Sequence, residues 1–562
     1  MTDRPTPTTT RDRMGGVRRV HMVGIGGIGM SSIAQVLIAR GFTVTGSDLR
    51  KGDNTARLEE MGATVYEGHR AENVADADVV VYSSAVRADE NPETAEAGRR
   101  LIPRIKRAEM LGELMRMRLG VGIAGTHGKT TTTTMVGLVA SHADLEPTII
   151  VGGKVATFGS NAVSGEGDVI VVEADEYDRT FLRLTPVVAV VTNIEADHLD
   201  TYPTGLPEIK EAFVEYANRV PFFGAAILCL DDANVRSVVG DIHRRVITYG
   251  TSRQATLRAE NIEQVGPATQ FDVVFQSERL GRVTLHAPGL HNVRNALAAV
   301  GVGLELDVPF ATIAAALAAY EGVERRFQIK GEGLLPPEAS GEDAPASVLV
   351  VDDYAHHPTE VEATLEAAAR GWPERRVVAV FQPHLYSRTQ DLQEEFARAF
   401  YDADVLVLTD VFPAREAPIE GVTGELIATL ARQYGHRDVH YVESKHDLPD
   451  ALRSLSRPGD LVVTMGAGDV WRYGQAFLDG LAQGGGKREE EGAASGDTPD
   501  TPSPMRSPLP AGEGQGEGRT EHQSPATPDL HTQTPEASRS AASGATPSPG
   551  PQSPAPRPSH DA

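Results

Sequence analysis

The heptapeptide Gly125-Thr-His-Gly-Lys-Thr-Thr131 constrains the fold of this chain more than any other stretch. It follows an apolar run at 119–124 and precedes a helix-like segment at 132–140. A strand, a glycine-rich loop and a helix in this order aim backbone N–H groups and a lysine at nucleotide phosphates, while a threonine hydroxyl meets Mg²⁺. The sequence therefore predicts an α/β unit that binds a phosphorylated nucleotide. The loop is not a strict Walker A motif, because Ile123 stands where that motif has its first glycine.

A second glycine-rich loop lies near the N-terminus. Gly24, Gly26 and Gly29 form G-x-G-x-x-G between a predicted strand at 18–23 and a predicted helix at 30–40. Asp48 follows the next strand, where a dinucleotide fold has an acidic residue for a ribose. The pattern favours a diphosphate at the helix N-terminus, from NAD or from a nucleotide-sugar; the alternative is a tight turn that requires glycine.

Two phosphate loops in consecutive units narrow the class of enzyme. A simple dehydrogenase has no use for the second loop. An enzyme that joins a nucleotide-linked substrate to another molecule at the expense of ATP needs both.

Acidic side chains follow two apolar strands of the second unit. Glu173, Asp175 and Glu176 come after the strand at 168–172, and the strand at 187–192 leads into Asn193-Ile-Glu-Ala-Asp-His198-Leu-Asp200. Carboxylates at the C-terminal ends of strands, close to bound phosphates, suit Mg²⁺. We predict Glu173 and His198 as metal ligands, and consider the other acids weaker candidates because some of them cap helices.

Further polar clusters lie at the start of a helix and around the second junction. His291, Asn292 and Asn295 either cap a helix or contact a ligand, and Arg325-Arg326 is either a solvated pair or a clamp on a transferring phosphate. Asp353, Tyr354, His356 and His357 follow the strand at 347–351. Adjacent histidines lack the usual spacing of metal ligands, so that substrate binding is favoured there.

Three α/β units between two polar tails account for the 562 residues. From about residue 485, Pro, Ser, Thr and Gly dominate, and such a tail cannot offset its ordering entropy by burying apolar surface. Gly120 and Gly322, near the junctions, are candidate hinges. We expect disorder at 1–16, α/β domains at 17–119, 120–322 and 323–483, and a disordered tail at 484–562.

Composition excludes several classes of function. A net charge of −25 disfavours nucleic-acid binding, which needs a basic surface. The single Cys229 excludes an intrachain disulfide framework and fits a reducing compartment. Residues 1–16 show no apolar signal-peptide region, and no apolar run approaches the roughly 18 residues that a membrane span needs. We expect a cytoplasmic protein without membrane insertion.

Seven motifs, in order over about 17–480, resemble the Mur ligase family. They are Gly24-Ile-Gly-Gly-Ile-Gly-Met-Ser31, Gly125–Thr131, Glu173-Ala-Asp-Glu176, Asn193–His198, His291-Asn-Val-Arg-Asn295, Arg325-Arg-Phe327 and Asp352-Asp-Tyr-Ala-His-His-Pro-Thr359. The resemblance implies a Rossmann-like N-terminal domain for a UDP-sugar, a P-loop-type central domain for ATP, and a Rossmann-like C-terminal domain for an amino acid.

Within the family, the chain is most similar to the branch that adds L-alanine. The resemblance implies an ATP-dependent ligase that joins L-alanine to the lactyl carboxylate of UDP-N-acetylmuramate through an acyl phosphate, giving ADP and phosphate, in peptidoglycan precursor synthesis. The nearest alternative is the peptide-recycling branch, which joins a murein tripeptide to the same sugar. A non-catalytic nucleotide-binding regulator is a further alternative. A monomer or weak homodimer is expected.

Site roles follow from the resemblance, position by position. The expected catalytic residues are Lys129, Arg326, Asp353 and His356. ATP is expected to contact Gly125, Thr126, His127, Gly128, Lys129, Thr130, Thr131, His291, Asn292, Asn295 and Arg326. Two Mg²⁺ ions are expected on Thr130, Glu173 and His198. The UDP-sugar is expected at Gly24, Gly26, Gly29, Asp48, His69, Ser83 and Ser84, and L-alanine at Tyr354, His356 and Arg388.

Two positions depart from the pattern of the family. Several relatives carry a carbamylated lysine in the second domain, whereas Lys210 is the only lysine here between His198 and Lys330, and no modification is predicted. Leu385 replaces an arginine of the usual Phe-Gln-Pro-His-Arg-Tyr motif, so that Arg388 is the candidate for that cationic contact.

Overall fold

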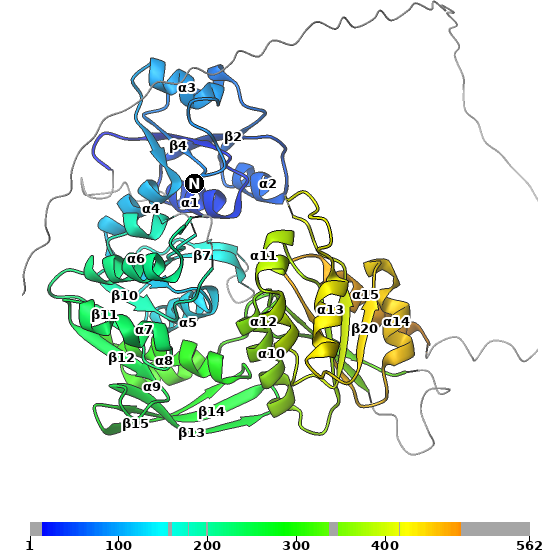
Figure 1. Cartoon of the computed structure of the whole chain (residues 1–562). Helices are drawn as coiled ribbons and strands as arrows, with labels where there is room; N and C mark the ends of the chain where they lie inside the picture. Colours follow the sequence, from blue (N-terminus) through cyan, green and yellow to red (C-terminus); the bar gives the residue numbers. More distant parts are fainter. Residues whose placement is uncertain are drawn as a thin grey trace, which may run out of the picture. The chain divides into compact units, whose positions relative to one another are not determined.

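A computed structural model describes residues 14–155, 160–177, 179–197, 201–335, 347–414 and 416–484 of the chain (Figure 1). The described residues form three sheets, each flanked by helices. The expected disorder at 1–13 and 485–562 concerns residues outside this part of the chain, whereas residues 14–16 form a turn.

The first sheet is entirely parallel and follows the predicted β–α alternation. Its order is β3-β2-β1-β4-β5. The strands are β1 (Arg19–Val23), β2 (Thr43–Asp48), β3 (Thr64–Glu67), β4 (Val79–Tyr82) and β5 (Arg104–Lys106). The helices are α1 (Ile28–Ala39), α2 (Asp53–Glu60), α3 (Pro92–Arg99) and α4 (Arg107–Arg116).

The second sheet has ten strands in the order β15-β14-β13-β12-β11-β10-β6-β9-β7-β8. The parallel strands of its centre and flanks are β6 (Leu119–Ala124), β7 (Thr148–Val155), β9 (Val169–Glu173), β10 (Val188–Val191), β11 (Ala225–Cys229) and β12 (Val246–Gly250). Its helices are α5 (Lys129–His142), α6 (Leu206–Asn218), α7 (Ala233–Val238), α8 (Leu290–Glu305) and α9 (Phe310–Ala318).

Strands with antiparallel partners extend this sheet at both edges, and the first of them pairs in parallel with β12; the sequence analysis missed these strands. At one edge, β13 (Leu257–Val265), β14 (Ala268–Phe275) and β15 (Glu278–Leu285) form a ribbon, and at the other β8 (Ser160–Val163) pairs with β7. Most of β13 is solvent-exposed, so its residues do not form the buried apolar run by which the central strands are recognised.

The third sheet has the order β16-β17-β21-β18-β19-β20, with only β16 antiparallel. Its strands are β16 (Gln328–Gly333), β17 (Val348–Asp353), β18 (Val377–Phe381), β19 (Val405–Thr409), β20 (Val439–Val442) and β21 (Leu461–Met465). Its helices are α10 (Pro358–Gly371), α11 (Tyr386–Asp391), α12 (Gln393–Arg398), α13 (Gly424–Gln433), α14 (Leu448–Leu455) and α15 (Val470–Gly484).

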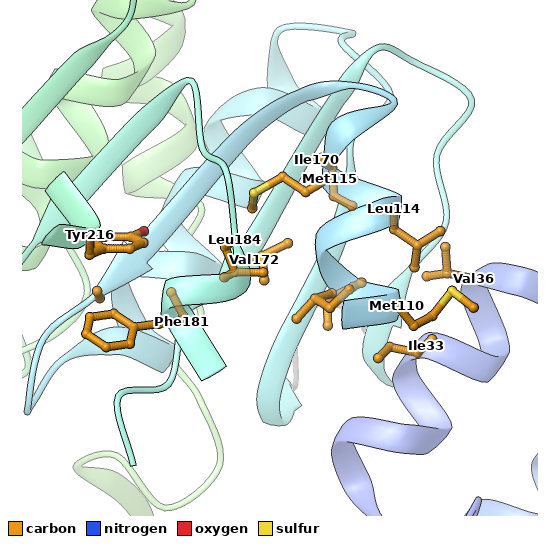
Figure 2. Packing of buried hydrophobic residues seen from close by; sticks show 14 of the residues in the cluster. Ile33, Val36, Met110, Leu114, Met115, Ile170, Val172, Phe181, Leu184 and Tyr216 are labelled. Carbon is orange, nitrogen blue, oxygen red and sulfur yellow. The ribbon is translucent and has the colours of Figure 1, made fainter. Parts of the chain in front are cut away.

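One continuous apolar cluster joins the first and second sheets. Figure 2 shows Ile33 of α1 beside Met110 and Leu114 of α4, with Ile170 and Val172 of β9 in the same buried cluster. The third sheet packs against its own helices in separate clusters. The first two units therefore share a core, while the third contacts the second through polar groups described below.

The two candidate hinge glycines differ in their surroundings. A Cβ at Gly120 would overlap Met115 inside the shared core, whereas Gly322 has a φ of +93° and open space around it. The packing thus favours Gly322, at the junction to the third unit, as the hinge. Among the described residues, no helix is long and apolar enough to cross a membrane.

Truncation in the shared core tests its continuity. Leu114 is fully buried, so Leu114→Ala is expected to destabilise the fold by about 2–5 kcal/mol, because a Leu-to-Ala change leaves a cavity. Scanning calorimetry should show the first and second units unfolding together at a lower temperature. The matched control is Leu101→Ala, at a side chain that is 90% exposed. Separate transitions for the two units would contradict the shared core.

Candidate active site

The phosphate loop connects β6 to α5 and requires glycine at two positions. Gly125 has a φ of +139°, and a Cβ there would overlap Thr192 at the end of the neighbouring β10. Gly128, the N-cap of α5, has a φ of +81°, and a Cβ would lie 2.6 Å from Asn295 Oδ1. The loop is thus clamped between β10 and α8, with the N-terminus of a 14-residue helix facing the expected phosphate site.

Lys129 folds back onto buried oxygens. Its ammonium donates to Glu176 Oε2 at 2.8 Å, to the Gly125 carbonyl at 2.6 Å and to the Thr126 carbonyl at 3.1 Å. Burial raises the pKa of Glu176 to about 7, although Lys129 counteracts this. The buried ammonium of Lys129 thus has Glu176 as its ion-pair partner.

The donors around Glu173 fit a magnesium ion. Thr130 Oγ1 donates to Glu173 Oε1 at 3.0 Å, and the Gly152 N–H donates to Oε2 at 2.7 Å. Burial raises the pKa of Glu173, so a nearby cation would stabilise its charged form. A threonine hydroxyl and a carboxylate are the hard oxygen ligands that Mg²⁺ prefers. His198 lies outside the described residues, and its expected metal role stays a prediction.

Two cavities meet at the phosphate loop. One, of about 570 Å³, is lined by Lys129, Thr130 and Glu173 together with Arg326, Tyr354 and His356. The other, of about 220 Å³, is lined by His127, Gly128 and Thr131 with residues that include His291, Asn292, Asn295, Arg326 and Asp353. Burial, followed by the positive charges of Arg294 and Arg326, lowers the pKa of His291 to about 4, so His291 is neutral at pH 7.

Arg325 and Arg326 have different surroundings. Arg325 is held inside the third unit, where Nε donates to Asp352 Oδ2 at 2.9 Å and Nη2 to the Gly466 carbonyl at 2.6 Å. Arg326 lines both cavities, and its Nη1 lies 3.4 Å from Glu360 Oε1. Arg325 also lines the cavity of about 570 Å³, but its guanidinium is bound by Asp352 and Gly466. Arg326 is therefore the better candidate of the pair, and its expected catalytic role stays a prediction.

Glu360, in the first turn of α10, is a central residue that the sequence analysis missed. It accepts from His127 Nδ1 at 3.1 Å and from the His356 backbone N–H at 3.0 Å, in addition to Arg326. Burial alone would raise the pKa of Glu360, but His356 and His127 hold it well below its usual range. One buried carboxylate of the third unit thus joins the phosphate loop, the junction arginine and the loop after β17.

His127 lies between two carboxylates. Its Nδ1 contacts Glu360 and its Nε2 lies 3.4 Å from Glu195 Oε2. Although burial opposes the charged form, Glu360 and Glu195 raise the pKa of His127 to about 10. The imidazolium therefore links the second unit to α10. Glu195 also accepts from Thr359 Oγ1 at 2.8 Å, and Arg388 Nη2 lies 3.2 Å from Asp197 Oδ1 across the same junction.

Asp353 uses its oxygens to shape the junction. It accepts from the Phe327 N–H at 2.6 Å and from the Ala355 N–H at 2.7 Å. Burial raises the pKa of Asp353 to about 6, although Arg326 counteracts this.

Leu385, the departure from the family pattern, has a φ of +70° and donates its N–H to the Phe412 carbonyl at 3.0 Å.

A third cavity, of about 1000 Å³, lies at the C-terminal edge of the first sheet. Its lining includes the expected residues Gly24, Gly26, Asp48, His69 and Ser83. Asp48 Oδ2 accepts from the Gly26 N–H at 2.8 Å, so it supports the glycine loop directly. Ser84 is solvent-exposed and does not line this cavity. Gly29 does not line it either and packs against Arg107.

Family models match the chain in three consecutive segments. They describe the Mur ligase family catalytic domain at residues 19–118, the Mur ligase middle domain at 123–303 and the Mur ligase glutamate ligase domain at 338–468.

Curated relatives and solved structures extend these matches. The UDP-N-acetylmuramate–L-alanine ligase of Salinibacter ruber is 62% identical over 85% of this chain and 98% of its own length. The ligase of the same name from Geobacter sulfurreducens is 53% identical over 84% of this chain and 99% of its own length. The structure of the UDP-N-acetylmuramate–alanine ligase of Thermotoga maritima matches with a TM-score of 0.65 at 29% identity, over 82% and 98%. The structure of a murein peptide ligase of Psychrobacter arcticus matches with a TM-score of 0.57 at 25% identity, over 83% of this chain and 99% of that chain.

The raised pKa of His127 predicts a pH-dependent contribution to stability. Imidazole titrates near 6.5 in the unfolded chain and at about 10 in the fold, so protonation stabilises the fold fully below pH 6.5 and no longer above pH 10. The contribution is at most about 5 kcal/mol. In EDTA, the difference in urea-unfolding free energy between the wild type and His127→Gln should shrink as pH rises through this window. For His243→Gln, at an exposed histidine, it should stay constant; a pH-independent difference for His127→Gln would contradict the ion pairs.

Proposed function

The chain belongs to the Mur ligase family, and we propose that it joins L-alanine to the lactyl carboxylate of UDP-N-acetylmuramate at the expense of ATP. Relatives at 62% and 53% identity over nearly their full length bear the name of this activity. One observation carries the proposal: the phosphate-loop Lys129, the Thr130–Glu173 pair, and Tyr354 and His356 of the third unit border a single cavity. Residues of the second unit that are expected to bind phosphate and residues of the third unit that are expected to bind the amino acid therefore border the same space. A phosphorylated intermediate would react there.

The chemistry takes two displacement steps. A lactyl carboxylate oxygen attacks the γ-phosphorus of ATP, the bond to the β,γ-bridging oxygen breaks, and ADP leaves. The neutral amine of L-alanine then attacks the acyl carbon, and the tetrahedral intermediate expels phosphate to leave an amide. Because carboxylate and ATP are both anionic, Lys129 and Arg326 lower the barrier by offsetting charge that accumulates on the transferred phosphoryl group. In this account Lys129 leaves Glu176 for the phosphates.

Magnesium would be held by Thr130 and Glu173, with His198 as the expected ligand of a second ion. The ions would supply charge neutralisation around the phosphates of ATP. Two ions are proposed because the resemblance to the family implies them, with ligands from Thr130 at the start of α5, Glu173 at the end of β9 and His198 after β10.

His356 is the better candidate for the base that takes the proton of the alanine ammonium. It lines the cavity of about 570 Å³, and its Nδ1 lies 3.0 Å from Glu360 Oε2, which fixes the orientation of the ring. Asp353, the other candidate, already accepts from two backbone N–H groups. Tyr354 and Arg388 are proposed to position L-alanine. His291, Asn292 and Asn295 are proposed at the nucleotide.

The UDP-sugar is proposed to bind in the cavity of the first sheet, on Gly24, Gly26, Asp48, His69 and Ser83. The domain boundaries are proposed at 119/120 and 322/323, although β6 already begins at Leu119. A cytoplasmic monomer or weak homodimer is proposed, since nucleotide substrates and a single cysteine fit a reducing compartment.

Ligation can be tested directly with labelled substrate. ADP formation should require both UDP-N-acetylmuramate and L-alanine, and ¹⁸O in the lactyl carboxylate should appear in the released phosphate, because its oxygen attacks the γ-phosphorus. Activity with a murein tripeptide in place of L-alanine would instead support the recycling alternative, although the murein peptide ligase of Psychrobacter arcticus is only 25% identical to this chain. Phosphate without ¹⁸O would contradict the acyl phosphate.

A variant pair controls this assay. Lys129→Ala should lower kcat by at least about 100-fold, as expected when one charge-stabilising donor is removed. Lys210→Ala, on α6 and outside the lining of the three cavities, should keep wild-type activity.

A further inference from the structure

Three side chains converge beside the phosphate loop. His127 is expected to contact ATP, whereas the other two have no role in the proposed reaction. His127, Glu195 and His357 each direct one ligand atom into a common space, and these atoms lie within 4.8 Å of one another. Glu195 Oε2 lies 3.4 Å from His127 Nε2 and 3.4 Å from His357 Nδ1. The cluster takes two residues from the second unit and His357 from the N-terminus of α10.

The histidines of this cluster have unsatisfied ring nitrogens. His357 is only 6% exposed, and neither of its nitrogens makes a hydrogen bond of normal geometry; nor does His127 Nε2. A neutral imidazole offers a metal ion the lone pair of its unprotonated ring nitrogen. Buried polar atoms without partners are costly, and a bound cation would satisfy His127 Nε2 and one of the two nitrogens of His357.

Neighbouring residues hold the ligands in orientation. Glu360 accepts from His127 Nδ1 at 3.1 Å, which turns Nε2 toward the cluster. Thr359 Oγ1 donates to Glu195 Oε2 at 2.8 Å. A carboxylate behind a ligating histidine is the arrangement that fixes tautomer and ring orientation at zinc sites.

We propose that His127, Glu195 and His357 form a zinc-binding site that joins the phosphate loop to the third unit. Ligands at 2.0–2.1 Å from a tetrahedral zinc lie about 3.3–3.5 Å apart, and two of the three separations here match this. Two imidazoles and one carboxylate favour Zn²⁺ over Mg²⁺, in contrast to the oxygen donors of Thr130 and Glu173.

Zinc at this position would replace the Nε2 proton that His127 directs at Glu195, whereas Nδ1 would keep its proton for Glu360. It would also fix His357 of α10 against the phosphate loop, whose His127 lines both cavities of the active site. The site therefore gives zinc a means to hold the second and third units together and to inhibit ligation.

Calorimetry tests this proposal. The full-length chain is stripped of metal and titrated with zinc in the absence of nucleotide and Mg²⁺. We expect one tight site per chain in the wild type and in His243→Gln, at an exposed histidine. His357→Gln should bind at least about tenfold more weakly, whereas Glu173→Gln, at the magnesium site, should keep the zinc affinity. Co²⁺ in the same site should give the intense visible absorption of four-coordinate geometry.

Unchanged zinc affinity in His357→Gln, or loss of the site in Glu173→Gln alone, would overturn the assignment. Thermal melting of each variant without metal separates lost ligation from lost folding. If His357→Gln is unstable, competition between Co²⁺ and Zn²⁺ on the wild type decides: an octahedral Co²⁺ spectrum would overturn the proposal. Neither result depends on ligase activity, so failure here leaves the proposed function unaffected.

Discussion

A single buried carboxylate, Glu360, organises the junction on which the active site depends. Burying a charge is expensive unless partners surround it, and Glu360 has three: His127 of the phosphate loop, Arg326 of the junction and His356 of the third unit. Each partner would be left in an unfavourable environment without it. The nucleotide, phosphoryl and amino-acid parts of the proposed site are thus held together by one helix terminus.

The three units are joined by different forces. The first and second share an apolar cluster in which α1, α4 and β9 pack together, and such an interface resists relative motion. The second and third meet through hydrogen bonds and ion pairs, such as His127–Glu360 and Arg388–Asp197, next to the unobstructed Gly322. We therefore expect any opening or closure of the site to be a movement of the third unit about Gly322.

The sequence predicted the buried parallel strands well, because an apolar run followed by polar residues indicates both a central strand and the functional edge of its sheet. The strand predicted at 168–172 is β9, and Glu173 lies at its end as expected. The β13–β15 ribbon gave no such signal, because most of β13 is exposed and the buried residues of β14 include the polar Thr269 and Asp272. Glu360 was missed because an acidic residue in the first turn of a helix is also explained by the helix dipole. Its role depends on His127, more than two hundred residues away in the chain, which periodicity does not reveal.

In the proposed site, the phosphate loop is directly coupled to α10 through the contact between His127 and Glu360. A double-mutant cycle on kcat/KM measures the energy of this coupling. His127→Asn and Glu360→Gln should each reduce activity, and the pair should show a coupling energy of about 0.5–3 kcal/mol, as expected for residues in contact. The same cycle with Glu366→Gln, farther along α10 and paired with Arg370, should be additive. Additive effects of His127→Asn and Glu360→Gln would contradict the account.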